Sequence, residues 1–224
     1  MITSNTPADP VARERQYLET VGSADWSGFE PVDEFRFSRP GGRLLSVALH
    51  VPETAATSGP TWMDAAVQTS PAGSLALVKA ENFRIPAARV RHYDQESCAL
   101  VGLYRDVPPR SAQGLRIAPD LSLLADAGKL SGWVLTRAPR HLAQWTDQHD
   151  TPGAGDAALA DALADFLDLI EERHLDHLYD GEPWLAERLT AIKQRIPEEP
   201  GANATGRAAL RARIDELMAD WFSA

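Results

Sequence analysis

Residues 156–178 have the sequence DAALADALADFLDLIEERHLDHL, in which apolar and acidic positions recur with the period of a helix. At about 100° per residue, the apolar side chains fall in one sector roughly a third of the helix wide. His174 and His177 fall in the same sector. The pattern predicts one long amphipathic helix, and its apolar face consists of Leu159, Leu163, Phe166, Leu167 and Ile170.

The opposite face of this predicted helix carries a row of carboxylates, each three or four residues from the next. Like charges at this spacing each destabilise an isolated helix by roughly 0.2 to 0.5 kcal/mol. Burial of the apolar face can offset that cost, but it does not explain why the acidic face is so uniform. We therefore expect this face to dock on a basic protein partner. Its members are Asp161, Asp165, Asp168, Glu172 and Asp176.

The rest of the C-terminal part is also predicted to be helical, because apolar residues repeat at i, i+4, i+7 and i+11 in two more segments. Three such apolar faces predict an antiparallel three-helix subdomain over 156–224. The segment DTPGAG at 150–155 predicts a linker between this subdomain and an N-terminal body over 1–149. The two repeats are Leu185, Leu189, Ile192 and Ile196, followed by Leu210, Ile214, Leu217 and Trp221.

The N-terminal body is predicted to be β-rich with short helices. Two apolar runs around a turn at 94–97 predict a hairpin over 87–107. Asp9, followed by Pro10, predicts the start of the first helix. Because the strands do not alternate with long helices, the pattern favours an α+β protein with a mostly antiparallel sheet. The other predicted strands cover 43–51, 74–80 and 130–137, and further short helices cover 61–68, 119–127 and a segment from Pro139.

The chain of 224 residues has a net charge of −10 that is unevenly distributed. Residues 141–183 contain one basic and eleven acidic residues, whereas residues 79–140 contain ten basic and six acidic ones. A negative surface repels the phosphates of nucleic acid and attracts basic proteins. The sequence therefore disfavours nucleic acid as a partner of the acidic helix, and leaves it as an alternative only for the basic middle of the chain.

No segment of the sequence predicts a membrane span, a signal peptide or a disulfide framework. Apolar runs such as CALVGLY at 98–104 are too short to cross a bilayer. The single cysteine, Cys98, lies in this apolar run, which favours a buried and inert thiol. With 44% hydrophobic and 24% charged residues, we expect a soluble cytoplasmic protein that does not bind membranes.

The sequence contains no G-x-S-x-G, P-loop, G-x-G-x-x-G or H-E-x-x-H motif, so it leaves open both whether a cofactor binds and whether the protein is an enzyme. One arrangement has the chemistry of a metal ligand set. Glu171 and His174 form an E-x-x-H unit, with His177 one turn further on, and His141 or His149 could complete a mononuclear site. A simpler interpretation is that the two histidines cover the helix end and interact with its dipole.

A second candidate site is the group of arginines Arg84, Arg89 and Arg91. In an extended segment Arg89 and Arg91 point to the same face. Guanidinium groups bind carboxylates and phosphates in bidentate geometry, so this face could contact an anion. A simpler interpretation is the solvated outer face of a sheet.

Three functions therefore compete. The sequence favours a non-catalytic interaction or assembly protein, which docks on a protein partner or on a second copy of itself through the acidic helix face. The first alternative is a metal-assisted enzyme that uses Glu171, His174 and His177. The second alternative is an anionic-ligand binder that uses the arginine-bearing strands. The interaction hypothesis ranks first because no catalytic motif is present.

Overall fold

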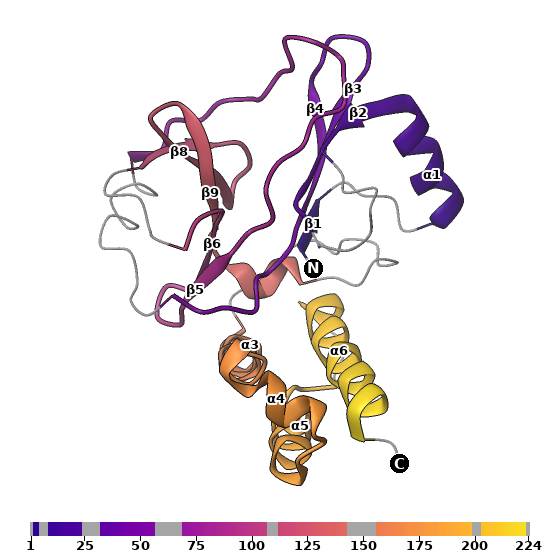
Figure 1. Ribbon diagram of the computed structural model, residues 1–224, viewed down its shortest axis with the longest axis vertical. Coiled ribbons are helices and arrows are strands. Elements are labelled where there is room, and N and C mark those ends of the chain that lie inside the picture. Colours follow the sequence, from indigo (N-terminus) through magenta and orange to yellow (C-terminus); the bar gives the residue numbers. More distant parts are fainter. Residues whose placement is uncertain are drawn as a thin grey trace.

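The computed structural model describes residues 2–4, 9–23, 32–56, 69–106, 112–142, 156–198 and 203–222. In this part of the chain, two antiparallel sheets lie beside each other at one end of the molecule, and helices of the C-terminal part form the other end (Figure 1). The α+β class predicted from the sequence is confirmed. The predicted helix at 61–68 and the predicted linker at 150–155 lie outside the described residues.

The first sheet has four strands in the order β1-β4-β3-β2. Phe35 and Phe37 of β3 are buried in the core, whereas Arg36 between them lies beneath the helix α1 (Pro10–Glu19) on the other face. This helix begins as predicted, because the Asp9 carboxylate accepts two backbone N–H groups of its first turn. The strands are β1 (Ile2–Ser4), β2 (Thr20–Gly22), β3 (Glu34–Ser38) and β4 (Leu44–Leu49).

The second sheet has five strands in the order β5-β6-β9-β8-β7. The predicted hairpin over 87–107 is confirmed as β5 and β6, and the predicted strand over 130–137 is confirmed as β9. Ala127 and Gly128 join β8 to β9 with φ angles of 49° and 76°, which is typical of a two-residue hairpin turn. The strands are β5 (Val90–Asp94), β6 (Ala99–Leu103), β7 (Gln113–Arg116), β8 (Leu121–Asp126) and β9 (Lys129–Leu135).

Two predictions for the body are wrong. The segment 119–127, predicted as a helix, contains β8, because Leu121 and Leu123 are buried in the main core while Leu124 enters a second cluster on the opposite face. A strand buried on both faces lacks the alternation that identifies strands in a sequence. The predicted strand at 74–80 is absent, and Ala76 forms only an isolated bridge in a segment that is mostly exposed.

The segment that connects β4 to β5 covers several sheet edges. An uncovered edge presents unpaired N–H and C=O groups that can pair with another chain. Here the connecting segment runs beside the outer strands β5, β7 and β2 and forms backbone hydrogen bonds with each of them. These bridges protect the edges and hold the two sheets together. They pair Ala55 with Arg91, Ala72 with Arg116, and Phe83 with Ser23.

The C-terminal part is helical, and α3, α5 and α6 contact one another. The predicted apolar stripes are buried in all three helices, except that Ile170, just past the end of α3, is half-buried and Trp221 remains 36% exposed. An antiparallel arrangement as a separate subdomain stays a prediction. The helices are α3 (Ala157–Leu169), α4 (Leu175–Tyr179), α5 (Pro183–Arg195) and α6 (Ala204–Phe222), with the short 3-10 helices η1 (Ala138–His141) and η2 (Glu172–His174).

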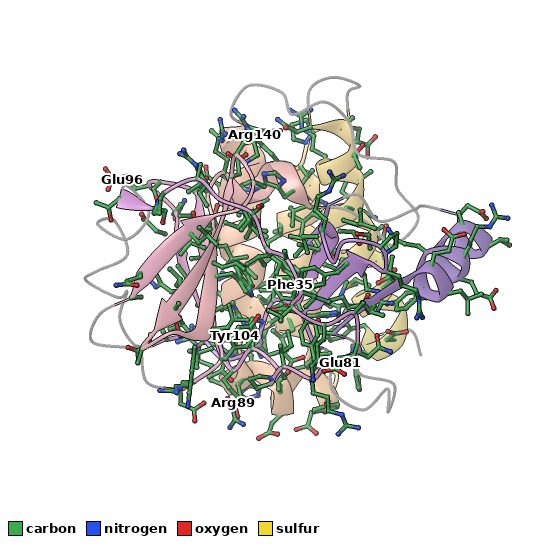
Figure 2. The ribbon with its side chains drawn as sticks, turned by 90° about the horizontal axis from the view of Figure 1, so that it is seen from above. Phe35, Glu81, Arg89, Glu96, Tyr104 and Arg140 are labelled. Carbon is green, nitrogen blue, oxygen red and sulfur yellow. The ribbon has the colours of Figure 1, made fainter. Side chains whose placement is uncertain are left out.

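One continuous apolar cluster joins the sheets to the helices. It contains Phe35 from the first sheet, Trp133 from the second, and Leu159, Leu189 and Ile214 from the three helices. Figure 2 shows Phe35 near the centre of the molecule, seen from above. Helix α3 is therefore held against the β-rich body by its apolar face, which limits how much of this helix can meet a partner.

Candidate functional site

The predicted helix over 156–178 is interrupted. Helix α3 ends at Leu169, the backbone N–H of Ile170 donates to carbonyls of the last turn, and Glu171 is extended with φ −67° and ψ 146°. The chain then continues through η2 and α4. The prediction of one continuous helix is therefore wrong. A helical period alone did not reveal the break, because the apolar positions keep nearly the same spacing across it.

The break divides the predicted acidic face. Asp161, Asp165 and Asp168 lie on α3, whereas Glu172 and Asp176 lie on η2 and α4. The three α3 carboxylates each have a partner within the chain. Asp161 accepts a hydrogen bond from Gln95 Nε2 at 2.8 Å, while Asp165 pairs with Arg195 and Asp168 pairs with Arg173. These contacts supply part of the compensation that a row of like charges requires.

The two remaining acidic residues differ from each other. The Glu172 carboxylate accepts a hydrogen bond from Thr54 Oγ1 at 2.8 Å, so this residue also faces the β-rich body. Asp176 is exposed on α4. Of the five predicted residues, Asp176 is therefore the best placed to meet another molecule, and it lies three residues before Tyr179 on α4.

An aromatic and acidic cluster occupies the corner where α4 meets α5. The Trp184 ring lies 5.6 Å from the His174 ring and 5.9 Å from the His177 ring, measured between centroids. Glu182 accepts hydrogen bonds from Trp184 Nε1 at 2.6 Å and from His177 Nδ1 at 2.8 Å. These hydrogen bonds hold the pKa of the Glu182 carboxyl below its ordinary value. The carboxylate is therefore charged beside the Trp184 indole.

A second aromatic pair continues this corner. Tyr179 at the end of α4 packs edge-on against Trp221 of α6, with ring centroids 4.7 Å apart. The turn between α4 and α5 contains Gly181, which has φ 63° and whose added Cβ would lie 3.2 Å from the Trp221 carbonyl oxygen. Tyr179, Trp184 and Trp221 are 62%, 37% and 36% exposed, which is unusual for such large apolar side chains.

We call this surface the α4–α5 corner, and define it by His174, Asp176, His177, Tyr179, Glu182, Trp184 and Trp221. Its charge is strongly negative. Residues 168–188 contain seven acidic residues and two arginines. Arg173 is occupied by Asp168 and by Glu171, the latter at 3.0 Å. The corner thus combines exposed aromatic rings with an excess of carboxylates.

The structure does not gather the predicted metal ligands into a site. Glu171 pairs with Arg173, His177 pairs with Glu182, and His174 packs on Trp184. In the part of the chain that the structure describes, no three His, Cys, Asp or Glu side chains form a group that could hold a metal ion. His149 lies outside that part, and His141 is occupied by Asp120.

The three predicted arginines lie in different environments. Arg84 is exposed, and Arg89 is exposed at the molecular periphery (Figure 2), where its Nε lies 3.2 Å from Asp106. Arg91 is only 2% exposed, and its guanidinium donates to the carbonyls of Pro52, Glu53 and Leu167. Burial lowers the pKa of the Arg91 guanidinium. Arg91 therefore fastens β5 to the last turn of α3 rather than lying on the solvated face of the sheet.

A charged cluster that the sequence did not predict joins β8, β9 and η1. The Asp120 carboxylate pairs with the Arg137 guanidinium and lies 2.9 Å from His141 Nε2. Burial alone would raise the pKa of Asp120, but the hydrogen bonds from Arg137 and His141 outweigh it and lower the pKa. A carboxylate-oriented imidazole can serve in acid–base catalysis. Here both partners of Asp120 also connect the end of the sheet to η1, which is a structural role.

Comparisons with known proteins do not assign a function to these groups. No protein-family model matches the chain, and neither a curated protein nor a solved structure is similar enough to match it. Within the described ranges, no helix has the length and apolar character needed to cross a membrane.

Proposed function

We propose that this chain is a non-catalytic interaction or assembly protein of the cytoplasm that docks on a basic protein partner through its acidic helical surface, centred on the α4–α5 corner. The observation that carries the proposal is the exposure of Tyr179, Trp184 and Trp221 among carboxylates. Isolated apolar residues on a surface are ordinary, but a group of large aromatic ones rimmed by charge is typical of an interface.

The chemistry of the corner favours a lysine- and arginine-rich segment. Aromatic rings attract cations over their faces, and Trp is the strongest of them. Glu182 supplies a carboxylate beside Trp184, and its hydrogen bond with His177 holds it in place. Asp176 adds a second carboxylate three residues before Tyr179 on α4. Charge complementarity of this kind favours rapid encounter and selects against acidic partners. A second copy of this chain could offer its own basic middle region, so self-association is an outcome that the test must distinguish.

Binding of a fluorescently labelled lysine- and arginine-rich peptide to the full chain tests the proposal. We expect saturable binding that weakens with salt, and no binding of an acidic peptide of the same length. Asp176→Lys and Trp184→Ala should each weaken binding about fivefold or more, because residues at the centre of an interface contribute ~1 kcal/mol or more. Circular dichroism verifies that both variants are folded.

Glu96→Lys is the matched control, because Glu96 is exposed in the turn between β5 and β6 and is not one of the residues that define the corner. It makes the same charge change and should leave the affinity unaltered. Equal binding of basic and acidic peptides, or equal losses in Asp176→Lys and Glu96→Lys, would contradict the proposal. Sedimentation at several protein concentrations separates self-association from peptide binding. If the chain dimerises and does not bind the basic peptide, the partner of the corner is a second copy of the chain.

A further inference from the structure

A pocket lies on the first sheet, away from the α4–α5 corner. It has a volume of about 670 Å³ and lies between the C-terminal half of α1 and the turn that joins β3 to β4. Arg15 and Leu18 line it from α1, Arg39 and Pro40 line it from the turn, and Thr20 lies between them at the start of β2. Arg39 is held at the pocket by its Nε, which donates to the Leu18 carbonyl at 3.2 Å.

Behind Thr20 lies a buried arginine whose hydrogen bonding is incomplete. Arg36 is 2% exposed, its Nε donates to Thr20 Oγ1 at 3.0 Å, and its Nη2 donates to the Tyr17 carbonyl at 3.2 Å. Its carbon Cζ lies 4.4 Å from the centre of the Tyr17 ring. Its Nη1 has no hydrogen-bond partner among the described residues. Buried polar groups without a partner are rare and require an explanation.

The charge around this arginine is not balanced. Arg15 and Arg39 line the pocket, the charge of Arg39 acts on Arg36, and Glu19 is the one carboxylate in the described lining. Glu34, the nearest acidic residue on β3, accepts a hydrogen bond from the Tyr17 hydroxyl. Burial lowers the pKa of the Arg36 guanidinium, and the charge of Arg39 adds to this shift while Glu34 opposes it. An anion bound between Arg15 and Arg39 would offset the excess of positive charge.

Part of the pocket wall is apolar, although Arg15, Gln16 and Glu19 of α1 also line it. Leu18 is 71% exposed, and Val11, two turns earlier on the same helix, is 63% exposed. Pro40 and Leu45 extend the apolar surface on the opposite side. Figure 2 shows α1 projecting from the body, so this surface is not covered by another described helix or strand. Cationic and apolar groups thus share one cavity.

We infer that this pocket binds a small amphiphilic anion, in which a phosphate or carboxylate group is attached to a short apolar chain. The oxyanion contacts Arg15 and Arg39 beside Thr20, where the positive charge of the buried Arg36 also attracts it. The apolar chain lies along Leu18, Pro40 and Leu45. This inference is independent of the proposed function, because the two surfaces share no residue.

Calorimetric titration of the full chain with octyl phosphate and octanoate, both kept below their micellar concentrations, tests the inference. We expect one site that binds at least one of them, and the stronger ligand identifies the headgroup. Inorganic phosphate and octanol, which lack one half of the ligand, should bind about tenfold more weakly or not at all. The double variant Arg15→Gln/Arg39→Gln should weaken binding about tenfold, since charge-assisted hydrogen bonds contribute most of the specificity for an oxyanion.

Arg188→Gln on α5 is the matched control, because it removes an exposed arginine outside the pocket and should leave the affinity unaltered. Arg36→Met tests whether the buried charge contributes to the affinity. If this variant does not fold, the affinity of the Arg15→Gln/Arg39→Gln variant decides whether the pocket binds the anion. Equal weakening by Arg188→Gln would overturn the inference, as would equal affinity for octanol. Binding to anionic vesicles without any binding of monomeric octyl phosphate or octanoate would also overturn it.

Discussion

The Oδ2 atom of Asp33 accepts a hydrogen bond from Nε1 of Trp133 at 2.8 Å, although the two residues are 100 positions apart. Both side chains are completely buried, and the contact joins the entry to β3 in the first sheet to β9 in the second. The Tyr104 hydroxyl donates to the same oxygen at 2.6 Å, and the backbone N–H of His50 donates to Oδ1 at 2.6 Å. Burial raises the pKa of Asp33, and these three donors oppose that shift.

Removal of one donor to Asp33 should destabilise the protein. Tyr104→Phe deletes only the hydroxyl and leaves a buried carboxylate with one partner fewer, which costs about 1–3 kcal/mol. Urea denaturation measures the loss in the free energy of unfolding. Tyr179→Phe is the control, because that ring is 62% exposed and its hydroxyl can bond to water. Equal stability of Tyr104→Phe and the wild type would show that the contact is energetically neutral.

The stability of the protein should depend on the titration of His50. Burial lowers the pKa of His50 from 6.5 to about 4, so the folded state favours the neutral imidazole. The contribution of His50 is therefore present above pH 6.5 and is lost as the pH falls toward about 4. Asp33 has the opposite sign, because its raised pKa favours folding at low pH. Urea denaturation of wild type and His50→Gln between pH 7 and pH 4 isolates the histidine: the difference between them should change with pH.

Arg91 and Arg89 should differ sharply in their contribution to stability. Arg91→Ala leaves three backbone carbonyls without a donor and opens a space between β5 and α3, which costs about 2–4 kcal/mol. Arg89→Ala removes an exposed ion pair with Asp106 and should cost less than about 1 kcal/mol. Thermal and urea denaturation of both variants measure the difference. Similar small losses would contradict the assignment of Arg91 as the fastening between the sheet and α3.

The hairpin between β8 and β9 can be stabilised by one substitution. Ala127 has φ 49°, a left-handed conformation that costs an alanine roughly 1 kcal/mol, whereas Asn tolerates it. Ala127→Asn should therefore raise the free energy of unfolding by about 0.5–1 kcal/mol. Gly128→Ala is the opposite control, because φ 76° at that position should make an added Cβ destabilising. No gain in the melting temperature of Ala127→Asn would contradict the turn geometry.

Sequence patterns over a few residues predicted the part of the candidate site that lies within one continuous segment. The acidic residues of 161–176 and the two histidines stand out in the sequence, and the structure places His174 and His177 in the α4–α5 corner. The sequence did not indicate that Trp184 and Trp221 would remain exposed. Both occupy helices with buried apolar stripes, and whether a residue at the end of a stripe is covered depends on which other helix packs there.

The sequence by itself determined the elements whose cause is local: the start of α1 at Asp9 and Pro10, the hairpin of β5 and β6, and the apolar stripes of α3, α5 and α6. Capping, turns and helical periodicity depend on residues a few positions apart, so they can be recognised in the sequence. Only the tertiary structure decided that 121–126 is a strand, that α3 ends at Leu169 and that Arg91 is buried. In each case the deciding partner is distant in sequence, because burial of both faces and satisfaction of backbone carbonyls depend on which elements meet in space.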